Sequence, residues 1–113
     1  MNRMFVITPE FDKLWSEVGN DDKELRYLQN YLLNNPKSGV VIPATDGLRK
    51  IRWNLKGKGK RGGIRILYLD IEKHEVTYFI SILKKNEKEN LTALDKILIK
   101  KKISLIKDIL DNK

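Results

Sequence analysis

Two neighbouring segments decide the fold of this chain. The first is the alternating run KIRWNLK at residues 50–56, the second is the apolar run IRILYL at residues 64–69, and GKGKRGG at residues 57–63 joins them. Strict alternation of polar and apolar residues is typical of a strand with one face in solvent, and the more apolar run is typical of a central strand. The four glycines between them favour a turn. The pattern therefore predicts two adjacent strands, of which the second is central in the sheet.

Before these strands, the sequence predicts one short strand and two helices. Residues 4–7 are an apolar strand, and Thr8-Pro9 then supplies a helix cap and a first helical residue. This helix ends at Gly19. Asp21 or Asp22 caps the next helix, which ends before Pro36 because the residue preceding a proline disfavours helical geometry. The residues expected to be buried by these helices are Phe11, Leu14, Trp15, Val18, Leu25, Leu28 and Leu32.

After these helices, residues 37–47 predict a loop punctuated by glycine and proline. Residues 70–75 predict a polar hairpin connection, and residues 76–83 predict the last strand. Residues 92–95 resemble a capping box that opens a helix running to about residue 110. The residues that give this helix its apolar side are Leu98, Ile99, Ile103, Ile106 and Leu110.

The chain has 113 residues, of which 41% are hydrophobic and 34% charged, a balance that favours one globular domain over residues 1–113. The order of elements predicts an α+β fold, a small antiparallel sheet on which two N-terminal helices and one C-terminal helix pack. The absence of cysteine excludes disulfides and thiolate chemistry. No apolar run approaches the roughly 20 residues that span a bilayer, so we expect a cytoplasmic protein without membrane contact.

The positive charge is concentrated in one segment. The chain carries 23 basic and 15 acidic residues, a net charge of +8. Eight of the basic residues lie between Arg49 and Arg65, where no acidic residue occurs, and the remaining 96 residues are neutral on balance. These eight are Arg49, Lys50, Arg52, Lys56, Lys58, Lys60, Arg61 and Arg65. Such segregation indicates a polyanionic partner, most simply RNA or DNA.

The glycine-rich segment at residues 57–63 nearly fits two nucleotide-binding motifs. It matches G-x-G-x-x-G, but that fingerprint requires a helix after it, and a strand follows here. The phosphate-loop motif fails because Gly63 stands where its lysine must be. What remains is a loop whose backbone N–H groups and basic side chains suit a phosphate. A solvated basic hairpin that serves only for docking is the alternative.

The residues resemble the RelE/HigB toxins of bacterial type II toxin–antitoxin systems (RelE/ParE superfamily), and the HigB-like branch most. The motifs that carry the resemblance are TDGLRKIR at 45–52, GKGKRGGIRILY at 57–68, KNEKENL at 85–91, N-P at 35–36 and G-x-x-I-P at 39–43. The resemblance covers Asn35 to about Leu91. It implies a RelE-like fold and a small endoribonuclease that cuts mRNA in the ribosomal A site, next to 16S and 23S ribosomal RNA. It also implies inhibition by a cognate HigA-like helix-turn-helix antitoxin.

The resemblance also implies roles for individual residues, with no cofactor and no metal. The RNA's own 2′-OH would attack the adjacent phosphorus, while arginines stabilise the phosphoryl oxygens and a lysine acts as general base or acid. The residues assigned to catalysis are Lys58, Lys60, Arg61, Arg65 and Lys85, and those assigned to RNA binding are Arg49, Lys50, Arg52 and Lys56. Which lysine transfers the proton stays open. One position departs from the family, because Leu83 stands where a tyrosine is common.

Two other functions fit parts of the pattern. A toxin of the same fold that poisons DNA gyrase would not need the lysine and arginine cluster, and a non-catalytic RNA-binding or ribosome-docking module would need only the charge of that cluster.

Other single residues have structural explanations. We expect His74 at the surface, Trp53 and Tyr68 in the core, and residues 100–102 on a solvated helix face.

Overall fold

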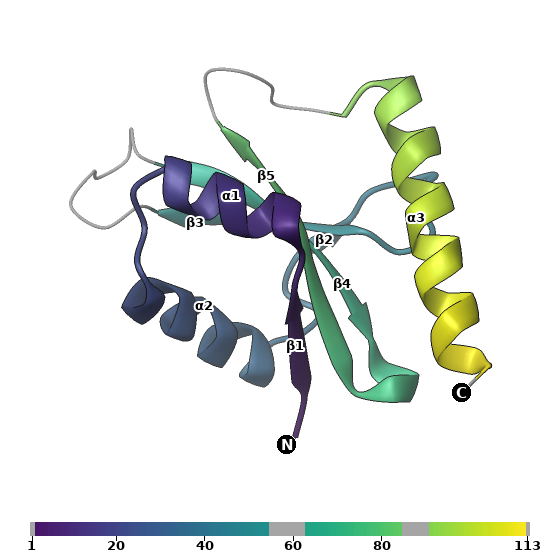
Figure 1. The fold of residues 1–113 in the computed structure, drawn as a ribbon, viewed down its shortest axis with the longest axis horizontal. Coiled ribbons are helices and arrows are strands. Elements are labelled where there is room, and N and C mark those ends of the chain that lie inside the picture. The colour runs from purple at the N-terminus through teal and green to yellow at the C-terminus, as the bar shows by residue number, and fades with distance from the viewer. Residues whose placement is uncertain (1, 55–62, 85–90, 113) are drawn as a thin grey trace.

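The computed structural model describes residues 2–54, 63–84 and 91–112. It confirms the α+β class, with three helices and a five-stranded sheet in these residues (Figure 1). The elements are β1 (Met4–Ile7), α1 (Pro9–Glu17), α2 (Asp22–Asn34), β2 (Val40–Val41), β3 (Arg49–Asn54), β4 (Gly63–Ile71), the 3₁₀ turn η2 (Glu72–His74), β5 (Val76–Lys84) and α3 (Ala93–Asp111).

The strand order is β1-β5-β4-β3-β2, and the sheet is mixed rather than wholly antiparallel. Strand β1 pairs in parallel with β5, while the other pairs are antiparallel as predicted. The predicted loop at residues 37–47 contains the short strand β2, which pairs with the beginning of β3. The predicted connection at residues 70–75 is shorter, because β4 continues to Ile71. The bounds of the other described elements lie within two or three residues of their predictions.

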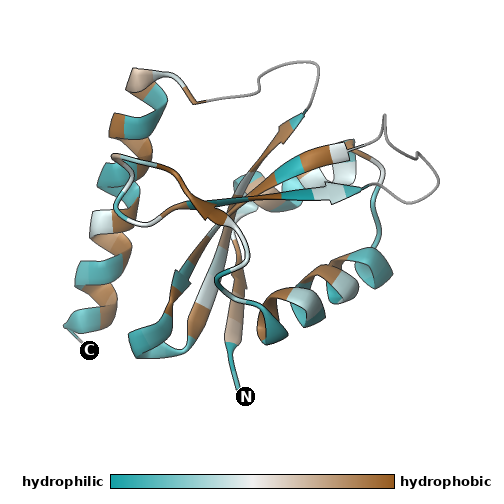
Figure 2. Ribbon diagram, turned by 180° about the vertical axis from the view of Figure 1, so that it is seen from behind, coloured by the Kyte–Doolittle hydropathy of each residue, from teal (hydrophilic) through white to brown (hydrophobic). Residues whose placement is uncertain are grey.

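Helices cover both faces of the sheet (Figures 1 and 2). One face packs on α1 and α2 through a cluster formed by Phe11, Trp15, Leu28, Leu32, Ile64, Ile66, Tyr68, Phe79 and Ile82. The other face packs on α3 and on the β2 region through a cluster formed by Ile42, Leu48, Leu67, Leu69, Ile71, Val76, Ile80, Leu83 and Ile103. The apolar residues of β4 alternate between these clusters, so this strand is buried on both sides.

Polar side chains begin each helix at the predicted position. The Thr8 hydroxyl and the Asp21 carboxylate accept hydrogen bonds from backbone N–H groups in the first turns of α1 and α2. Thr92 and Asp95 form both hydrogen bonds of a capping box at α3. The hydroxyl of Thr8 also donates to the carbonyl of Phe79 at 2.8 Å, which fixes α1 to β5. These caps satisfy N–H groups that a helix leaves without partners.

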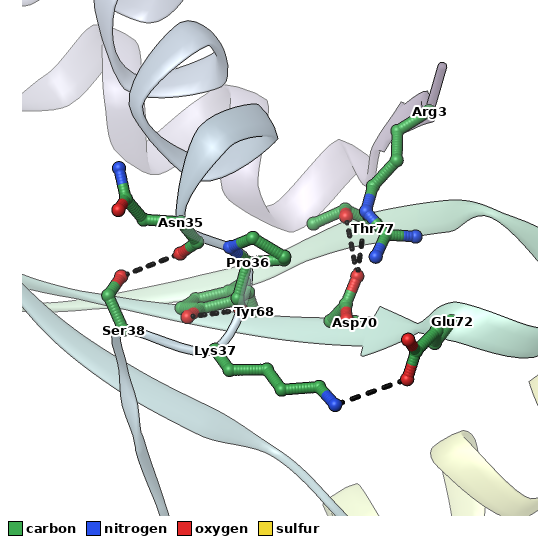
Figure 3. A network of polar contacts seen from close by, with 9 residues as sticks. All are labelled: Arg3, Asn35, Pro36, Lys37, Ser38, Tyr68, Asp70, Glu72 and Thr77. Atoms are coloured by element: carbon green, nitrogen blue, oxygen red, sulfur yellow. Dashed lines mark hydrogen bonds and ion pairs between the residues drawn. The ribbon is translucent and has the colours of Figure 1, made fainter. Parts of the chain in front are cut away.

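The buried tyrosine Tyr68 joins the sheet to the segment that follows α2. Its hydroxyl donates to the carbonyl of Pro36 at 2.9 Å (Figure 3). The same hydroxyl accepts from the N–H of Gly39 at 2.9 Å. A Cβ on Gly39 would lie 2.7 Å from the tyrosine Oη, so the close approach requires glycine. The N-P and G-x-x-I-P positions thus have a structural role, and the prediction of a buried Tyr68 is confirmed.

A buried ion pair fixes the N-terminal end of β1. The Nε of Arg3 lies 3.3 Å from Oδ1 of Asp70, and the side chains are only 5% and 3% exposed. Thr77 donates to the same carboxylate oxygen at 3.2 Å, as Figure 3 shows. Removing one partner of such a pair leaves a buried charge uncompensated. The pair therefore holds the beginning of β1 against Asp70 of β4 and Thr77 of β5.

Three further predictions concern single residues. Trp53 is partly buried against the α1–α2 cluster, which agrees with a core role. His74 lies at the surface but is held, because its Nε2 is 2.7 Å from Oδ1 of Asp111. This hydrogen bond, helped by Lys73, lowers the pKa of Asp111. The prediction that Leu98 faces the core is wrong, since this side chain is 53% exposed.

Within the described residues, no helix is long and apolar enough to cross a membrane.

We predict that Tyr68→Phe lowers the free energy of unfolding by about 1–3 kcal/mol, because it leaves a buried carbonyl and a buried N–H without their partner. Urea denaturation at neutral pH measures the change. Tyr27→Phe is the control, since Tyr27 is 52% exposed, and it should alter stability by less than about 0.5 kcal/mol. Equal stability of wild type and Tyr68→Phe would contradict the role of the hydroxyl.

Alkaline pH tests the same hydroxyl. Burial raises the pKa of Tyr68 above its ordinary value of 10.0, and the hydrogen bond from Gly39 opposes this only in part. The folded state therefore prefers the protonated tyrosine, and the resulting stability is complete below pH 10.0 and is lost as the pH rises through the raised pKa. The stability of wild type relative to Tyr68→Phe should fall above pH 10. A difference independent of pH would refute this coupling.

Candidate nucleic-acid interface

The pairing of β3 with β4 places basic side chains on one face of the sheet. Arg52 is directly opposite Arg65, and Lys50 is opposite Leu67. Residues directly opposite each other in an antiparallel pair share a face, and alternation puts Lys50, Arg52 and Asn54 on that same face. Lys50, Arg52, Asn54 and Arg65 therefore share one face of the sheet. It is the face on which α3 packs further along the sheet.

The two arginines form a cross-strand pair of like charge. Such pairs destabilise a sheet unless another group compensates the charge. No described residue forms an ion pair with Lys50, Arg52 or Arg65. The Nη1 of Arg65 is buried and has no hydrogen-bond partner among the described residues, although buried polar groups are almost always paired. A phosphate would relieve both features, because its oxygens accept hydrogen bonds from two guanidinium groups at once.

A hollow of about 190 Å³ opens on this face, next to Lys50 and to Leu83, the partner of Arg65 on β5. Lys50 and Lys96 line it, together with Leu83 and the two valines of β2. Lys96 belongs to the first turns of α3 and is not among the site residues predicted from the sequence. Nothing in the local sequence indicates it, because only the packing of α3 on the sheet brings it near Lys50. Lys96 thus adds a fourth cation to Lys50, Arg52 and Arg65 of β3 and β4.

The structure does not bring Arg49 to this face. Arg49 is opposite Tyr68, on the side of the sheet that α1 and α2 cover. Its Nη1 donates to the carbonyls of Gly39 at 2.7 Å and Lys37 at 3.2 Å. Arg49 thus holds the segment before β2, and RNA binding by this residue stays a prediction that its position does not favour.

Leu83 lies directly across from Arg65 on β5, so it is part of this face. It is buried in the cluster beneath α3 and 8% exposed. The position at which the resemblance leads us to expect a tyrosine therefore adjoins Arg65. In this chain an apolar side chain supports Arg65 there, and it supplies no hydroxyl.

The other five predicted site residues lie outside the described residues, namely Lys56, Lys58, Lys60, Arg61 and Lys85. In the part of the chain that is described, no group of three or more His, Asp or Glu side chains could hold a metal ion. The described portion of the site consists of Lys50, Arg52, Asn54, Arg65, Leu83 and Lys96, which we call the basic face.

Solved structures of toxins share this architecture, although no protein-family model matches the sequence. The chain is similar to an arginine-to-alanine double mutant of the E. coli toxin RelE in the free state, with a TM-score of 0.56 and 20% identity over 77% of this chain and 88% of that one. The fold is RelE-like. A second similar structure is the intact E. coli RelBE toxin–antitoxin complex, with a TM-score of 0.53 and 19% identity over 79% of this chain and 100% of the matched chain.

These matches confirm the predicted RelE-like fold, and they do not distinguish a HigB-like branch. At this identity they establish the architecture alone. The functional chemistry that we propose for this chain therefore rests on the residues of the basic face.

We predict that the salt dependence of RNA binding identifies the phosphate contacts. Binding of a short single-stranded RNA with 2′-O-methyl groups, which cannot attack the phosphorus, should weaken as salt rises. Arg52→Gln should reduce the slope of log K against log salt by about 0.7, the value for one lost contact with a single strand. Fluorescence anisotropy over a series of salt concentrations measures it.

Arg49→Gln is the matched control on the same strand. Its guanidinium already donates to two carbonyls on the other face, so the slope should not change even where stability falls. An equal loss of slope in both variants would show that binding responds to net charge and not to the basic face.

Proposed function

We propose that this chain is the toxin of a type II toxin–antitoxin system and acts as a ribosome-dependent mRNA endoribonuclease in the cytoplasm. The observation that carries the proposal is the pair Arg52–Arg65, two arginines opposite each other that no described residue compensates, with a buried guanidinium nitrogen that lacks a partner among those residues. A single-stranded mRNA would supply the anionic oxygens that the described part of the chain does not offer this pair. The RelE-like fold supports the same function.

Cleavage would use the RNA's own 2′-OH as nucleophile. The oxygen attacks the adjacent phosphorus in line, the 5′ oxygen leaves, and a 2′,3′-cyclic phosphate remains. The protein must align these atoms and stabilise the charge on the phosphoryl oxygens. We assign that stabilisation to Arg65 together with Arg61, because a guanidinium holds two phosphate oxygens at once. Arg52, Lys50 and Lys56 bind flanking phosphates.

Proton transfer falls to a lysine in this scheme. Lys58, Lys60 and Lys85 are the candidates, because neighbouring cations depress the pKa of an ammonium group and bring it nearer to neutrality. The segment from Arg49 to Arg65 has no carboxylate. The developing charge is therefore assigned to arginine and lysine, which makes the proposed mechanism independent of metal ions.

The proposed partner is a cognate antitoxin that neutralises the chain. The motifs at residues 45–52 and 57–68 favour the HigB-like branch, and hence a HigA-like antitoxin with a helix-turn-helix domain. The mRNA would be cut in the ribosomal A site, so 16S and 23S ribosomal RNA form part of the surroundings in which the basic face acts.

We predict that induced expression of this chain in bacteria arrests translation and cuts mRNA within codons. Arg65→Ala should lower cleavage by on the order of 10²–10³, the usual loss when a group that stabilises transition-state charge is removed. Lys85→Ala should lower it as well if this lysine transfers the proton. Mapping of mRNA 5′ ends after induction gives the cleavage sites and their frequency.

Arg26→Ala provides a control, since Arg26 is exposed on α2 away from the basic face. This variant should cleave like wild type. DNA damage with intact mRNA would indicate a gyrase poison instead, and harmless expression would indicate a binding module without catalysis. Either outcome overturns the proposed function.

A further inference from the structure

A second group of cations lies on the side of α3 that faces the loop after β2 (Figures 1 and 2). Lys96, Lys100 and Lys101 line a hollow of about 540 Å³ there, together with Ala44 of the loop. The remaining described lining residues also belong to α3, namely Ala93, Ile97 and Ser104. None of these lining residues carries a carboxylate. We call Lys96, Lys100 and Lys101 the α3 lysine patch.

Helical spacing brings the three lysines together. Lys96 and Lys100 are four residues apart, so they are neighbours on the helix surface. Lys101 stands four residues after Ile97, which is 54% exposed and lines the same hollow. Like charges at a spacing of four destabilise a helix rather than support it. The patch therefore has a cost for α3 that a bound anion would offset.

No acid among the described residues compensates the patch. Lys96, Lys100 and Lys101 form no ion pair within the described part of the chain. Lys107 of the same helix shows the contrast, because its Nζ lies 3.4 Å from Oδ1 of Asp46 and donates to the carbonyl of Asp46 at 2.8 Å. Asp46, an acid of the loop beside the hollow, is thus already paired.

The neighbouring Lys102 has a different environment. Lys100, Lys101 and Lys102 are all exposed, as the sequence predicts for residues 100–102. Lys102, however, lines the two hollows between α3 and α1, and Glu10 lines both of these as well. The three consecutive lysines therefore face two sides of the helix, and only Lys100 and Lys101 belong to a surface without acids.

The α3 lysine patch is continuous with the basic face. Lys96 lines both the 540 Å³ hollow and the 190 Å³ hollow of the basic face. The two hollows also meet along the loop, because Pro43 lines one and the next residue, Ala44, lines the other. The cations thus extend from the sheet past Lys96 to Lys100 and Lys101. A ligand with repeated negative charge can follow such a path, as single-stranded nucleic acids follow basic grooves.

We propose that the α3 lysine patch binds phosphates of the same RNA strand that occupies the basic face, beyond the nucleotides that contact Arg52 and Arg65. The identity of this strand as mRNA rests on the proposed function. Lysines would also attract an acidic peptide, but continuity at Lys96 favours the ligand of the basic face, since a strand bound there has only to continue along α3. The patch thereby lengthens the RNA that the chain holds.

Two fluorescently labelled single-stranded RNAs with 2′-O-methyl groups are the probes, of roughly 4 and roughly 12 nucleotides, which bracket most site sizes of single-strand-binding domains. Fluorescence anisotropy with the full chain measures the slope of log K against log salt for each. Lys100→Gln and Lys101→Gln should each reduce the slope for the long RNA by about 0.7, the value for one lost phosphate contact. Neither should change the slope for the short RNA. Both positions are exposed, so the fold should tolerate the changes.

Lys102→Gln is the matched control, because it removes the same charge from the next residue of the helix on the side of α1. It should leave both slopes unchanged. An equal loss of slope in Lys102→Gln, an equal loss for the short RNA, or an unchanged slope in Lys100→Gln would each overturn the proposal.

Two further measurements separate the other ligands of such a patch. A polyglutamate peptide that binds wild type and is lost in Lys100→Gln, while the long RNA is unaffected, would assign the patch to an acidic protein. Reduced co-sedimentation of Lys100→Gln with ribosomes, again with the long RNA unaffected, would assign it to ribosomal RNA. Either result overturns the proposal and leaves the proposed function standing. Wild type that binds neither RNA would overturn the proposed function as well, so the two failures are distinguishable.

Discussion

The antiparallel register of β3 against β4 is the constraint on which the rest of the molecule depends. It sets Arg52 opposite Arg65 on one face and Trp53 opposite Ile64 on the other. A slip of one residue would move every side chain of β3 to the other face, so that the cations would enter the α1–α2 core. The hydroxyl of Tyr68 reinforces the register from the middle of β4, because it reaches the chain on both sides of Lys37. Core packing and the basic face are therefore two results of one alignment.

The local parts of this fold can be predicted from the sequence. Thr8, Asp21 and Thr92 each begin a helix, because a side-chain oxygen followed by acidic residues satisfies the first N–H groups wherever it occurs. The non-local parts cannot. The parallel pairing of β1 with β5 and the short strand β2 depend on where distant segments meet. The prediction that Leu98 is buried is wrong for a related reason. Helix α3 is apolar on two sides, and periodicity alone does not show which side faces the sheet.

The candidate site likewise has a part that the sequence predicts and a part that it does not. Alternation along β3 is enough to group Lys50 with Arg52, since side chains two residues apart always share a face. It cannot show that Arg52 and Arg65 are opposite each other, because that depends on the length and geometry of the connection at residues 55–62. Lys96 was missed because it lies on a helix more than forty residues away in the sequence. The resemblance groups Arg49 with the RNA-binding residues, and only the structure shows that its guanidinium donates to the carbonyls of Gly39 and Lys37.

The uses of arginine in this chain show why charge has to be considered together with partners. Arg3 is buried against Asp70, and Arg49 donates to backbone carbonyls, so both cations are compensated inside the protein. Arg52 and Arg65 have no such acceptor among the described residues. A fold that needed these two only for solubility would gain stability by placing an acid beside one of them, as Asp70 lies beside Arg3. Keeping two like charges opposite each other on adjacent strands costs stability, and the polyanion binding that we propose would account for that cost.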